Sequence, residues 1–293
     1  MNMFNAQRKI WHGKGIIESN LKLAEQTFHL TLNAQGTLPT INAGQFVMLR
    51  LQNRTNPLLG RPFAVYRVSE NVLEVIYLVV GKMTQCLAEL RKGDTLDFWT
   101  PLGNGFSPIS TPAHIIMVAG GIGQTPFLML AEKYFQTDSH CTLLYGTQNA
   151  ERIICVDDFK KLGVDIHLAT DDGSCNSGFN SYHGFVTDLI SQVYQPEEPT
   201  QIFCCGPRPM LSAAFQVACQ LKLPCEVSLE TSMSCGLGIC FGCVVQCRCE
   251  KEKKIDNETE STTNKMNKIV NETWDYRRTC IDGPVFDAYK LCW

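Results

Sequence analysis

The first hundred residues place apolar and polar side chains in short alternating runs. Residues 28–32 change from apolar to polar at every step, as a strand with one buried face does. Residues 45–51 and 72–80 are further strand candidates, with turn-forming residues between the runs. One short helix is predicted over residues 83–90, ended by Gly93. This pattern predicts a small antiparallel β-barrel.

The middle of the chain alternates strand-like and helix-like segments. Residues 114–119 form a largely apolar run that ends in two glycines, and a helix is predicted over residues 126–135. The pattern continues through residues 141–145, 165–170, 184–193, 200–205 and 209–221. Strands that alternate with helices predict a parallel sheet with helices on both faces.

The last part of the chain carries a concentration of cysteines and one polar stretch. Residues 250–254 and 257–268 are rich in Lys, Glu, Asn and Thr and have almost no apolar side chains, which predicts a solvated insertion. We therefore expect an α+β multidomain protein. Its predicted parts are an antiparallel β-barrel domain (1–108), an α/β parallel-sheet domain (109–224) and a cysteine-containing domain (225–293) with a polar insertion near 250–276.

Composition narrows the function classes. The chain has 293 residues, 44% of them hydrophobic and 19% charged, so it can bury real cores. Its net charge is −3 and no basic stripe is visible, which argues against nucleic-acid binding. No apolar run is long enough to span a bilayer, and the first ten residues lack the apolar core of a signal peptide. We expect a cytoplasmic protein whose 15 cysteines are mostly reduced thiols or metal ligands.

Four of these cysteines have a diagnostic spacing. Cys235, Cys240 and Cys243 read C-x4-C-x2-C, and Cys280 follows after a gap, which is the plant-type arrangement for a [2Fe–2S] cluster. Glycines between the cysteines allow a tight loop with backbone N–H groups facing the cluster. A four-cysteine zinc site would usually show two C-x2-C pairs, and disulfides would need an oxidising compartment. Other cysteines near this motif, Cys247, Cys249 and Cys292, are either inert thiols or alternative ligands.

Two glycine-containing loops follow predicted strands of the parallel sheet. Residues 118–126 carry three glycines between a strand and a helix, where backbone can approach a pyrophosphate. The loop lacks the complete G-x-G-x-x-G pattern, so an ordinary turn is the alternative. Residues 204–210 form the second loop. Because loops at the carboxyl ends of parallel strands flank the ligand crevice of such sheets, the two together predict a nucleotide site.

The predicted barrel holds two further candidates for phosphate binding. Arg61 precedes Pro62, and a guanidinium fixed in this way can grip a phosphate with two hydrogen bonds, although a surface Arg before a strand is the simpler explanation. Residues 81–84 open the short predicted helix, where backbone N–H groups can also hold phosphate. His167 and His183 have no carboxylate-and-nucleophile setting in the sequence, and we assign them no catalytic role.

These motifs occur in the order known from one enzyme group. The chain resembles the ferredoxin–NADP reductase superfamily and, more closely, the electron-transfer subunits of class B (NAD-dependent) dihydroorotate dehydrogenase. The resemblance covers nearly the whole chain except the polar insertion. It rests on Arg61-Pro62, Gly81-Lys82, residues 101–106, Gly120-Gly121-Ile122-Gly123, Cys205-Gly206-Pro207, residues 230–235, the cysteine motif and residues 280–286.

The resemblance implies the cofactors FAD, NAD and a [2Fe–2S] cluster, and no catalytic acid or base. It implies that the barrel domain binds FAD through Arg61, Pro62, Phe63, Ala64, Ile76, Tyr77, Leu78, Met83 and Thr84. It places the nicotinamide nucleotide at Gly121, Ile122, Gly123, Gln124, Thr125, Cys205, Gly206 and Pro207. The cluster ligands would be Cys235, Cys240, Cys243 and Cys280.

The implied function is electron transfer in pyrimidine biosynthesis. An FMN-containing dihydroorotate dehydrogenase catalytic subunit would be the partner, in a heterotetramer of two of each chain, with electrons passing from its FMN through the cluster and FAD to NAD⁺. The alternatives are a related NAD(P)H–ferredoxin or sulfide-type reductase subunit and a cofactor-poor regulatory protein. A transhydrogenase small subunit of the first kind typically has Asp at the position of Cys235, and intact cysteine and glycine motifs argue against the second.

The chain departs from the family in two places. Ala64 stands where the family often has Ser or Thr, so a bound flavin must find another hydrogen-bond partner near its N5 atom. The polar insertion lengthens the gap before Cys280. Loop-closure cost grows slowly with length, so the gap does not prevent ligation by Cys280.

Overall fold

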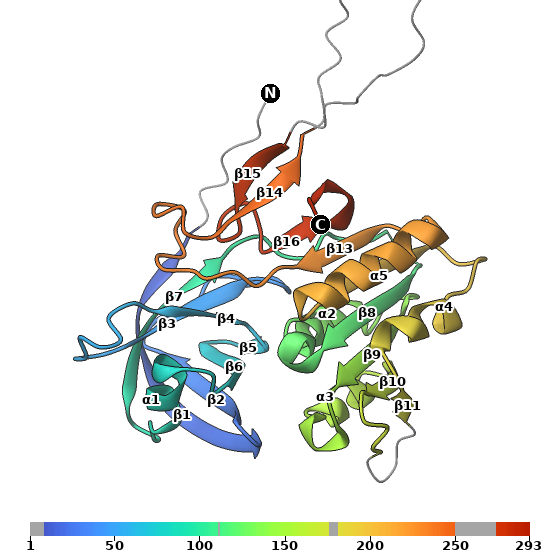
Figure 1. The fold of residues 1–293 in the computed structure, drawn as a ribbon. Helices are drawn as coiled ribbons and strands as arrows, with labels where there is room; N and C mark the ends of the chain where they lie inside the picture. Colours follow the sequence, from blue (N-terminus) through green and yellow to red (C-terminus); the bar gives the residue numbers. More distant parts are fainter. Residues whose placement is uncertain (1–8, 111, 176–180, 250–273) are drawn as a thin grey trace, which may run out of the picture.

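A computed structural model describes residues 9–110, 112–175, 181–249 and 274–293. Two seven-stranded sheets lie side by side, and a two-stranded hairpin lies above them in the view of Figure 1. The sequence predictions for residues 250–273 lie outside the described residues. Within the described ranges, no helix is both long and apolar enough to cross a bilayer.

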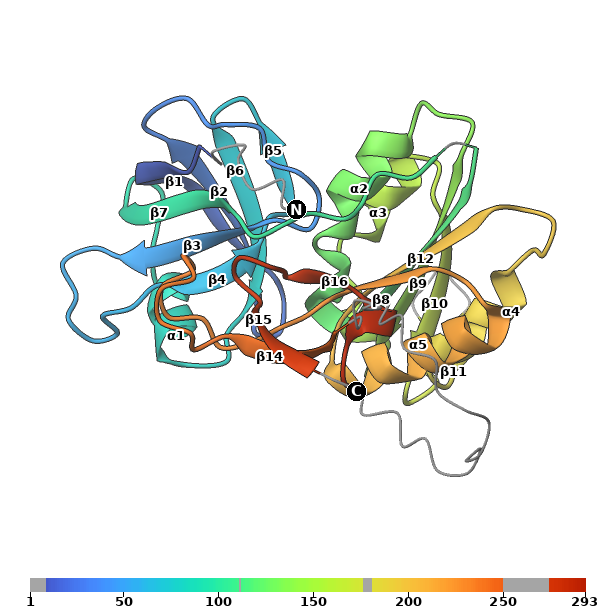
Figure 2. The same ribbon diagram turned by 90° about the horizontal axis from the view of Figure 1, so that it is seen from above.

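The first sheet is antiparallel throughout and curls into a half-barrel (Figures 1 and 2). Alternate residues of its strands, such as Leu30 and Leu32, point into one apolar core, which Met83 and Leu87 of helix α1 also enter. The strand order is β4-β3-β7-β1-β2-β6-β5. The elements are β1 (Trp11–Ala24), β2 (Thr27–Ala34), β3 (Phe46–Leu51), β4 (Arg61–Ala64), β5 (Arg67–Ser69), β6 (Val72–Leu78), α1 (Lys82–Ala88) and β7 (Thr95–Leu102).

The second sheet is parallel except at one edge, where β16 runs antiparallel to β13. Its order is β11-β10-β9-β8-β12-β13-β16. The strands are β8 (His114–Gly120), β9 (His140–Thr147), β10 (Asp165–Thr170), β11 (Ser181–His183), β12 (Thr200–Cys205), β13 (Cys225–Ser228) and β16 (Val285–Asp287). The helices are α2 (Phe127–Tyr134), α3 (Val156–Lys161), α4 (Ile190–Val193) and α5 (Arg208–Leu221), with 3₁₀ turns η1 (Gly121–Gln124), η2 (Ala150–Arg152), η3 (Val186–Leu189) and η4 (Ala288–Lys290).

Strand β8 shows why this sheet needs helices on both faces. Ile115 and Met117 belong to the core that contains residues of α2 and α3. Ile116 and Val118, one position along, belong to the core that contains residues of α4 and α5. A strand buried on both faces reads as a continuous apolar run, which is the pattern that predicted it.

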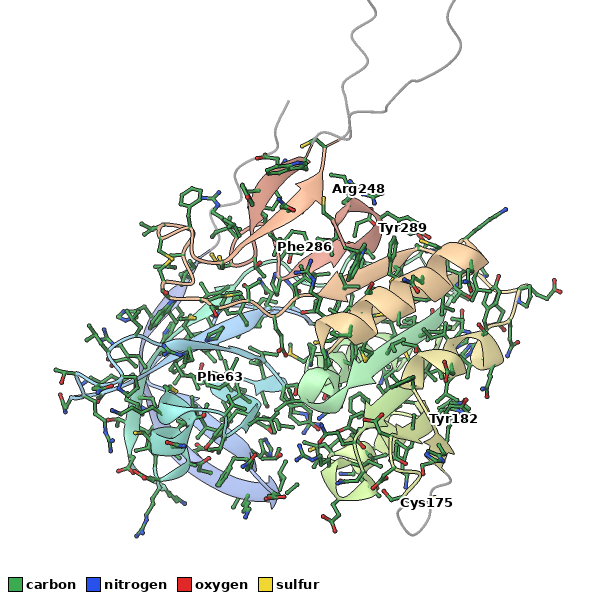
Figure 3. All side chains as sticks on the ribbon, viewed as in Figure 1. Phe63, Cys175, Tyr182, Arg248, Phe286 and Tyr289 are labelled. Atoms are coloured by element: carbon green, nitrogen blue, oxygen red, sulfur yellow. The ribbon has the colours of Figure 1, made fainter. Side chains whose placement is uncertain are left out.

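The C-terminal segment joins the two sheets. After β13 the chain crosses to the half-barrel, forms the hairpin of β14 (Val244–Arg248) and β15 (Trp274–Arg278), and returns to the second sheet as β16. Figure 3 shows Phe286 and Tyr289, from the end of the chain, beside α5. The Tyr289 hydroxyl donates to the Leu223 carbonyl over 2.9 Å, which fixes this end against the helix.

The predicted strands and helices of both sheets are confirmed, with differences at several ends. Helix α1 ends at Ala88, earlier than predicted. Trp274 and Tyr276, at the predicted end of the polar insertion, lie in β15 and pair with β14. Several elements had no counterpart among the predictions: helix α3 and strands β1, β5, β7, β11, β13, β14, β15 and β16.

Candidate functional site

The two glycine loops meet at one end of the parallel sheet. Strands β8 and β12 are neighbours and run in the same direction, so the loops that follow them lie together. A side-chain carbon at Gly123 would overlap the backbone carbonyl of Cys205. Gly206 has a φ of +155°. A Cβ atom added to Gly206 would lie 3.0 Å from the backbone of Gly120. Glycine is therefore needed for the two loops to touch.

A cavity of about 610 Å³ opens over these loops. Asp171, just beyond the end of β10, lines the cavity, and its backbone N–H donates to the Thr147 carbonyl over 3.1 Å. The wall also includes Gly120, Gly121, Ile122, Gly146, Thr147, Gln148, Arg152, Gly206, Pro207 and Met210. We call this the nucleotide cavity.

A second cavity, of about 450 Å³, lies between the half-barrel and the parallel sheet. All nine residues predicted to bind FAD line it: Arg61, Pro62, Phe63, Ala64, Ile76, Tyr77, Leu78, Met83 and Thr84. Figure 3 labels Phe63, which comes from β4. We call this the flavin cavity.

The residues predicted for the nicotinamide nucleotide divide between the cavities. Gly121, Ile122, Gly206 and Pro207 line the nucleotide cavity. Gly123, Thr125 and Cys205 line the flavin cavity. Gln124 lines neither: it is fully buried, and neither its side-chain oxygen nor its nitrogen has a hydrogen-bond partner among the described residues.

Three residues, Leu78, Ile122 and Glu230, line both cavities. Ligands in the two cavities would therefore meet across this shared wall. Burial raises the pKa of Glu230 above its usual value, because an ionised carboxylate is poorly solvated there.

Hydrogen-bonding groups in the flavin cavity fit a polar cofactor. Thr231 is one of the residues that line the cavity, and its hydroxyl oxygen is buried and has no partner among the described residues. A buried hydroxyl without a partner is costly, so a ligand that bonds it is favoured. One nitrogen of the Arg61 guanidinium donates to the carbonyls of Leu59 (3.1 Å) and Gly60 (3.0 Å), which aims the otherwise exposed side chain along its own loop. Thr84 accepts from the N–H groups of Val80 and Gly81 and so shapes the start of α1.

The first three cysteines of the motif lie on a tight loop at the side of the half-barrel. The sulfur atoms of Cys235 and Cys240 are 3.4 Å apart. Burial opposes the thiolate of Cys235, but the N–H groups of Leu237, Cys240 and Ile239 lower its pKa to about 6. Gly238 permits this turn: its φ is +76°, and a Cβ atom there would lie 2.5 Å from the Ile281 side chain.

The fourth cysteine reaches the loop through its neighbours in sequence. Thr279 donates from both its N–H (2.9 Å) and its hydroxyl (2.8 Å) to the Cys243 carbonyl, and Arg278 donates to the Gly238 carbonyl over 3.0 Å. Burial, followed by the adjacent Cys243 thiol, raises the pKa of Cys280 to about 12. Four thiols, with backbone N–H groups directed at Cys235, fit the donor set of a [2Fe–2S] cluster.

An apolar contact joins the flavin cavity to the cysteines. Phe46 and Met233 line the cavity. The same two side chains pack with Cys243 and Cys280 in one small core. The nucleotide cavity, the flavin cavity and the cysteines are therefore contiguous, in that order.

Sequence patterns did not identify several of these residues as parts of a site. Phe46 is far in sequence from Glu230 and Met233, and only the folded topology brings them together at the flavin cavity. Asp171 had a usable signal, because an acidic residue at the end of a strand in a nucleotide-binding sheet often meets the ribose of a dinucleotide.

Comparisons with known proteins agree with this arrangement. Residues 117–216 match the family described as the oxidoreductase NAD-binding domain. The "Dihydroorotate dehydrogenase B (NAD(+)), electron transfer subunit" of Caldanaerobacter subterraneus subsp. tengcongensis is 30% identical over 281 residues, which cover 96% of this chain and 98% of the relative. The protein of the same name from Geobacillus sp. (strain WCH70) is 33% identical over 274 residues, covering 92% and 94%.

Solved structures show the same fold. A chain from the structure of NADH-dependent reduced ferredoxin-NADP oxidoreductase superposes with a TM-score of 0.76 at 24% identity, covering 95% of this chain and 90% of its own length. A ferredoxin NADP⁺ reductase from Neisseria gonorrhoeae with bound FAD and NADP gives 0.60 at 19% identity, covering 72% and 91%. The resemblance found in the sequence is confirmed, and the chain belongs to the family of dihydroorotate dehydrogenase B electron transfer subunits.

Proposed function

We propose that this chain is the electron-transfer subunit of an NAD-dependent dihydroorotate dehydrogenase in pyrimidine biosynthesis. Electrons from the FMN of a catalytic partner subunit would pass through a [2Fe–2S] cluster and FAD of this chain to NAD⁺. The observation that carries the proposal is the unbroken series of nucleotide cavity, flavin cavity and cysteine core, linked by Ile122 and Glu230 at one junction and by Phe46 and Met233 at the other.

Each region would hold one redox group. FAD would occupy the domain of residues 1–108 and NAD that of residues 109–224, with the predicted residues that line each cavity as contacts. Residues 225–293 would form the cluster domain, with ligands Cys235, Cys240, Cys243 and Cys280, even though β13 and β16 join the second sheet. When bound, FAD exchanges electron pairs with the nicotinamide and single electrons with the cluster, and the protein contributes order and distance.

The chain's own residues would position these groups. The shared wall of Leu78, Ile122 and Glu230 would set the nicotinamide against the flavin ring. Ala64 offers no hydroxyl at the flavin, and the unpartnered Thr231 hydroxyl in the same cavity would supply a hydrogen bond instead. Met233 would separate the flavin from the cluster by side-chain atoms that exclude water.

A partner would dock beside the cysteine loop. Leu237, Ile239 and Phe241 surround the ligand cysteines and are 40%, 76% and 61% exposed. Apolar side chains this exposed, close to an electron-transfer centre, favour a protein interface. We propose that the FMN-containing catalytic subunit covers them, in an assembly with two copies of each chain.

Co-expression with the catalytic subunit tests the proposal. This chain alone should carry electrons from NADH to artificial acceptors and should not oxidise dihydroorotate. Together, the two chains should co-purify and catalyse dihydroorotate oxidation that depends on NAD⁺. If the pair co-purifies without NAD-dependent turnover although FAD and cluster are fully loaded, the proposed electron path is wrong.

A further inference from the structure

The amino ends of three neighbouring strands gather two histidines and a glutamate. His114 is the first residue of β8, His140 is the first residue of β9, and Glu198 lies two residues before β12. The strand pairing places His114 opposite His140, and the His114 N–H donates to the Pro199 carbonyl over 2.8 Å. This cluster lies at the end of the sheet opposite the glycine loops, so it is separate from the cavities described above.

The metal-ligating atoms of the three side chains lie close together. One ligating atom from each lies within 4.8 Å of the others. The imidazole rings of His114 and His140 stack with their centroids 4.0 Å apart, and His140 Nδ1 is 3.5 Å from a Glu198 carboxylate oxygen. The His140 and Glu198 side chains are 48% and 40% exposed, whereas His114 is buried. The cluster thus has a buried wall and an open side.

His114 carries a buried nitrogen that nothing in the described chain satisfies. Its Nε2 lies 2.9 Å from the hydroxyl of Thr142, which is itself buried. Its Nδ1 is buried and has no hydrogen-bond partner among the described residues. The Thr142 contact allows the tautomer in which Nε2–H donates to the hydroxyl, and Nδ1 then carries a lone pair that can bind a metal ion. Metal-ligating histidines are held in this way, with the second ring nitrogen donating to an oxygen.

We propose that His114 Nδ1, a ring nitrogen of His140 and the Glu198 carboxylate bind a first-row divalent metal ion, with Zn²⁺ as the best match. Two imidazoles and one carboxylate are a known zinc ligand set that leaves a fourth position for water. Zinc–nitrogen bonds of about 2.1 Å place tetrahedral ligand atoms roughly 3.4 Å apart. The His140–Glu198 separation already matches this distance, and these two exposed side chains can move to complete the site.

Two simpler explanations leave part of the arrangement unaccounted for. A surface ion pair explains the contact of His140 with Glu198. Ring stacking explains the packing of the two histidines. Neither gives the buried His114 Nδ1 a partner, and an unsatisfied buried nitrogen is destabilising. A metal ion would satisfy it and would tie together the amino ends of β8, β9 and the segment before β12.

Zinc binding to the holoprotein, with FAD and cluster in place, tests this site. Bound Zn²⁺ is measured by equilibrium dialysis and elemental analysis in the wild type and in His140→Asn, Glu198→Gln, Thr142→Val and the control His167→Asn. His167 is an apt control because it also pairs with a carboxylate, Asp165, over 2.9 Å on the neighbouring strand β10. Every variant keeps all the cysteines, so zinc bound by thiols contributes equally to each.

We expect the wild type and His167→Asn to bind one zinc ion per chain that His140→Asn and Glu198→Gln bind at least about 100-fold more weakly. Thr142→Val, which removes only the outer partner of His114, should weaken binding by about 10–100-fold. Circular dichroism and FAD absorbance should be the same in all five proteins. If the wild type and His140→Asn bind zinc with equal affinity, the proposed site is wrong. If Thr142→Val binds zinc as tightly as the wild type, His114 is not one of the ligands.

Discussion

Two glycine-containing loops of this molecule offer a ligand different kinds of atom. The cysteine loop (residues 234–243) presents side-chain atoms, and its exposed apolar residues surround the sulfurs. The glycine loop (residues 120–125) presents backbone, and its neighbour across the sheet is the backbone of Cys205 and Gly206. The cysteine loop should therefore lose its ligand when a sulfur atom is removed. The glycine loop should lose its ligand when a side-chain carbon is added to a glycine.

The difference explains why one motif is informative in sequence and the other is not. Four cysteines at the plant-type spacing match few sites other than a [2Fe–2S] cluster, so the cysteine pattern alone indicates its ligand. Glycines after a strand are common in turns of every kind. The glycine loop can be interpreted as part of a nucleotide site only when the fold is known, because β12 places a second loop against it.

Cys235→Ser should have the largest effect. A serine oxygen is a poor substitute for a thiolate, so we expect loss of the cluster absorbance and of NAD-dependent dihydroorotate oxidation, with FAD retained. The flavin cavity does not include Cys235, which is why the two cofactors should separate. Iron content, FAD absorbance and turnover of the complex are the measurements. Cys219→Ser, at an exposed cysteine of α5, is the control. Unchanged iron in Cys235→Ser would contradict the ligand assignment.

Gly123→Ala tests the effect of adding a side-chain carbon to the glycine loop. The added carbon would overlap the Cys205 carbonyl group, and because this obstacle is backbone, the two loops must move apart. We expect kcat/KM for NADH with an artificial acceptor to fall by at least about tenfold, which corresponds to about 1.4 kcal/mol. The cluster spectrum should not change. Gly163→Ala is the control, since it adds the same methyl group where no atom lies within 4 Å. Its positive φ should cost about 1–2 kcal/mol of stability without altering KM. Equal loss of activity in both variants would mean that loop contact is unimportant.

Gly238→Ala asks whether the cysteine loop also depends on its backbone. The φ of +76° should cost about 1–2 kcal/mol for alanine, and the Ile281 side chain must shift to make room. We expect slower cluster assembly and a lower iron content that does not reach zero, measured by reconstitution. Gly242→Ala in the same loop is the matched control, because its nearest neighbour would be the Cys240 sulfur at 3.6 Å. Identical reconstitution of both variants would show that only the thiols matter.

Sequence patterns predicted best what depends on few residues close together. The apolar run of β8 and the cysteine spacing are of this kind. Strand β1 was missed because its sequence, WHGKGIIESNLKLA, interrupts the alternation with polar pairs that the long strand leaves at the surface. Helix α3 has only six residues and begins after Cys155 at a φ of +58°, so no periodic signal announces it. Glu230 and Met233 reach the flavin cavity through topology alone, which no local pattern encodes.

The nucleotide preference should show a smaller effect. Asp171 and Arg152 both line the nucleotide cavity, so the cavity offers a carboxylate, which disfavours a 2′-phosphate, as well as a positive charge. We expect kcat/KM for NADH to exceed that for NADPH, and Asp171→Asn to narrow the ratio by several-fold. Asp172→Asn is the control, as Asp172 bonds Ser174 and does not line the cavity. Comparable kcat/KM values for both nucleotides in the wild type would contradict the prediction.

Deletion of residues 257–268 should have the smallest effect on cofactor content and activity. It tests whether Cys280 depends on the long connection in sequence or on its contacts with the cysteine loop. The deleted segment has almost no apolar residues, so its removal takes little apolar surface from the protein. Arg248 pairs with Trp274 across the hairpin, and Thr279 bonds the Cys243 carbonyl, so Cys280 is held by contacts on both sides of the deletion. Halving the connection changes loop closure by only about 0.6 kcal/mol. We therefore expect unchanged iron and FAD content and nearly full reduction of artificial acceptors by NADH. Loss of the cluster on deletion would show that the cysteine loop needs more than its thiols and these hydrogen bonds. The cysteine loop would then differ from the glycine loop in more than its use of side-chain atoms.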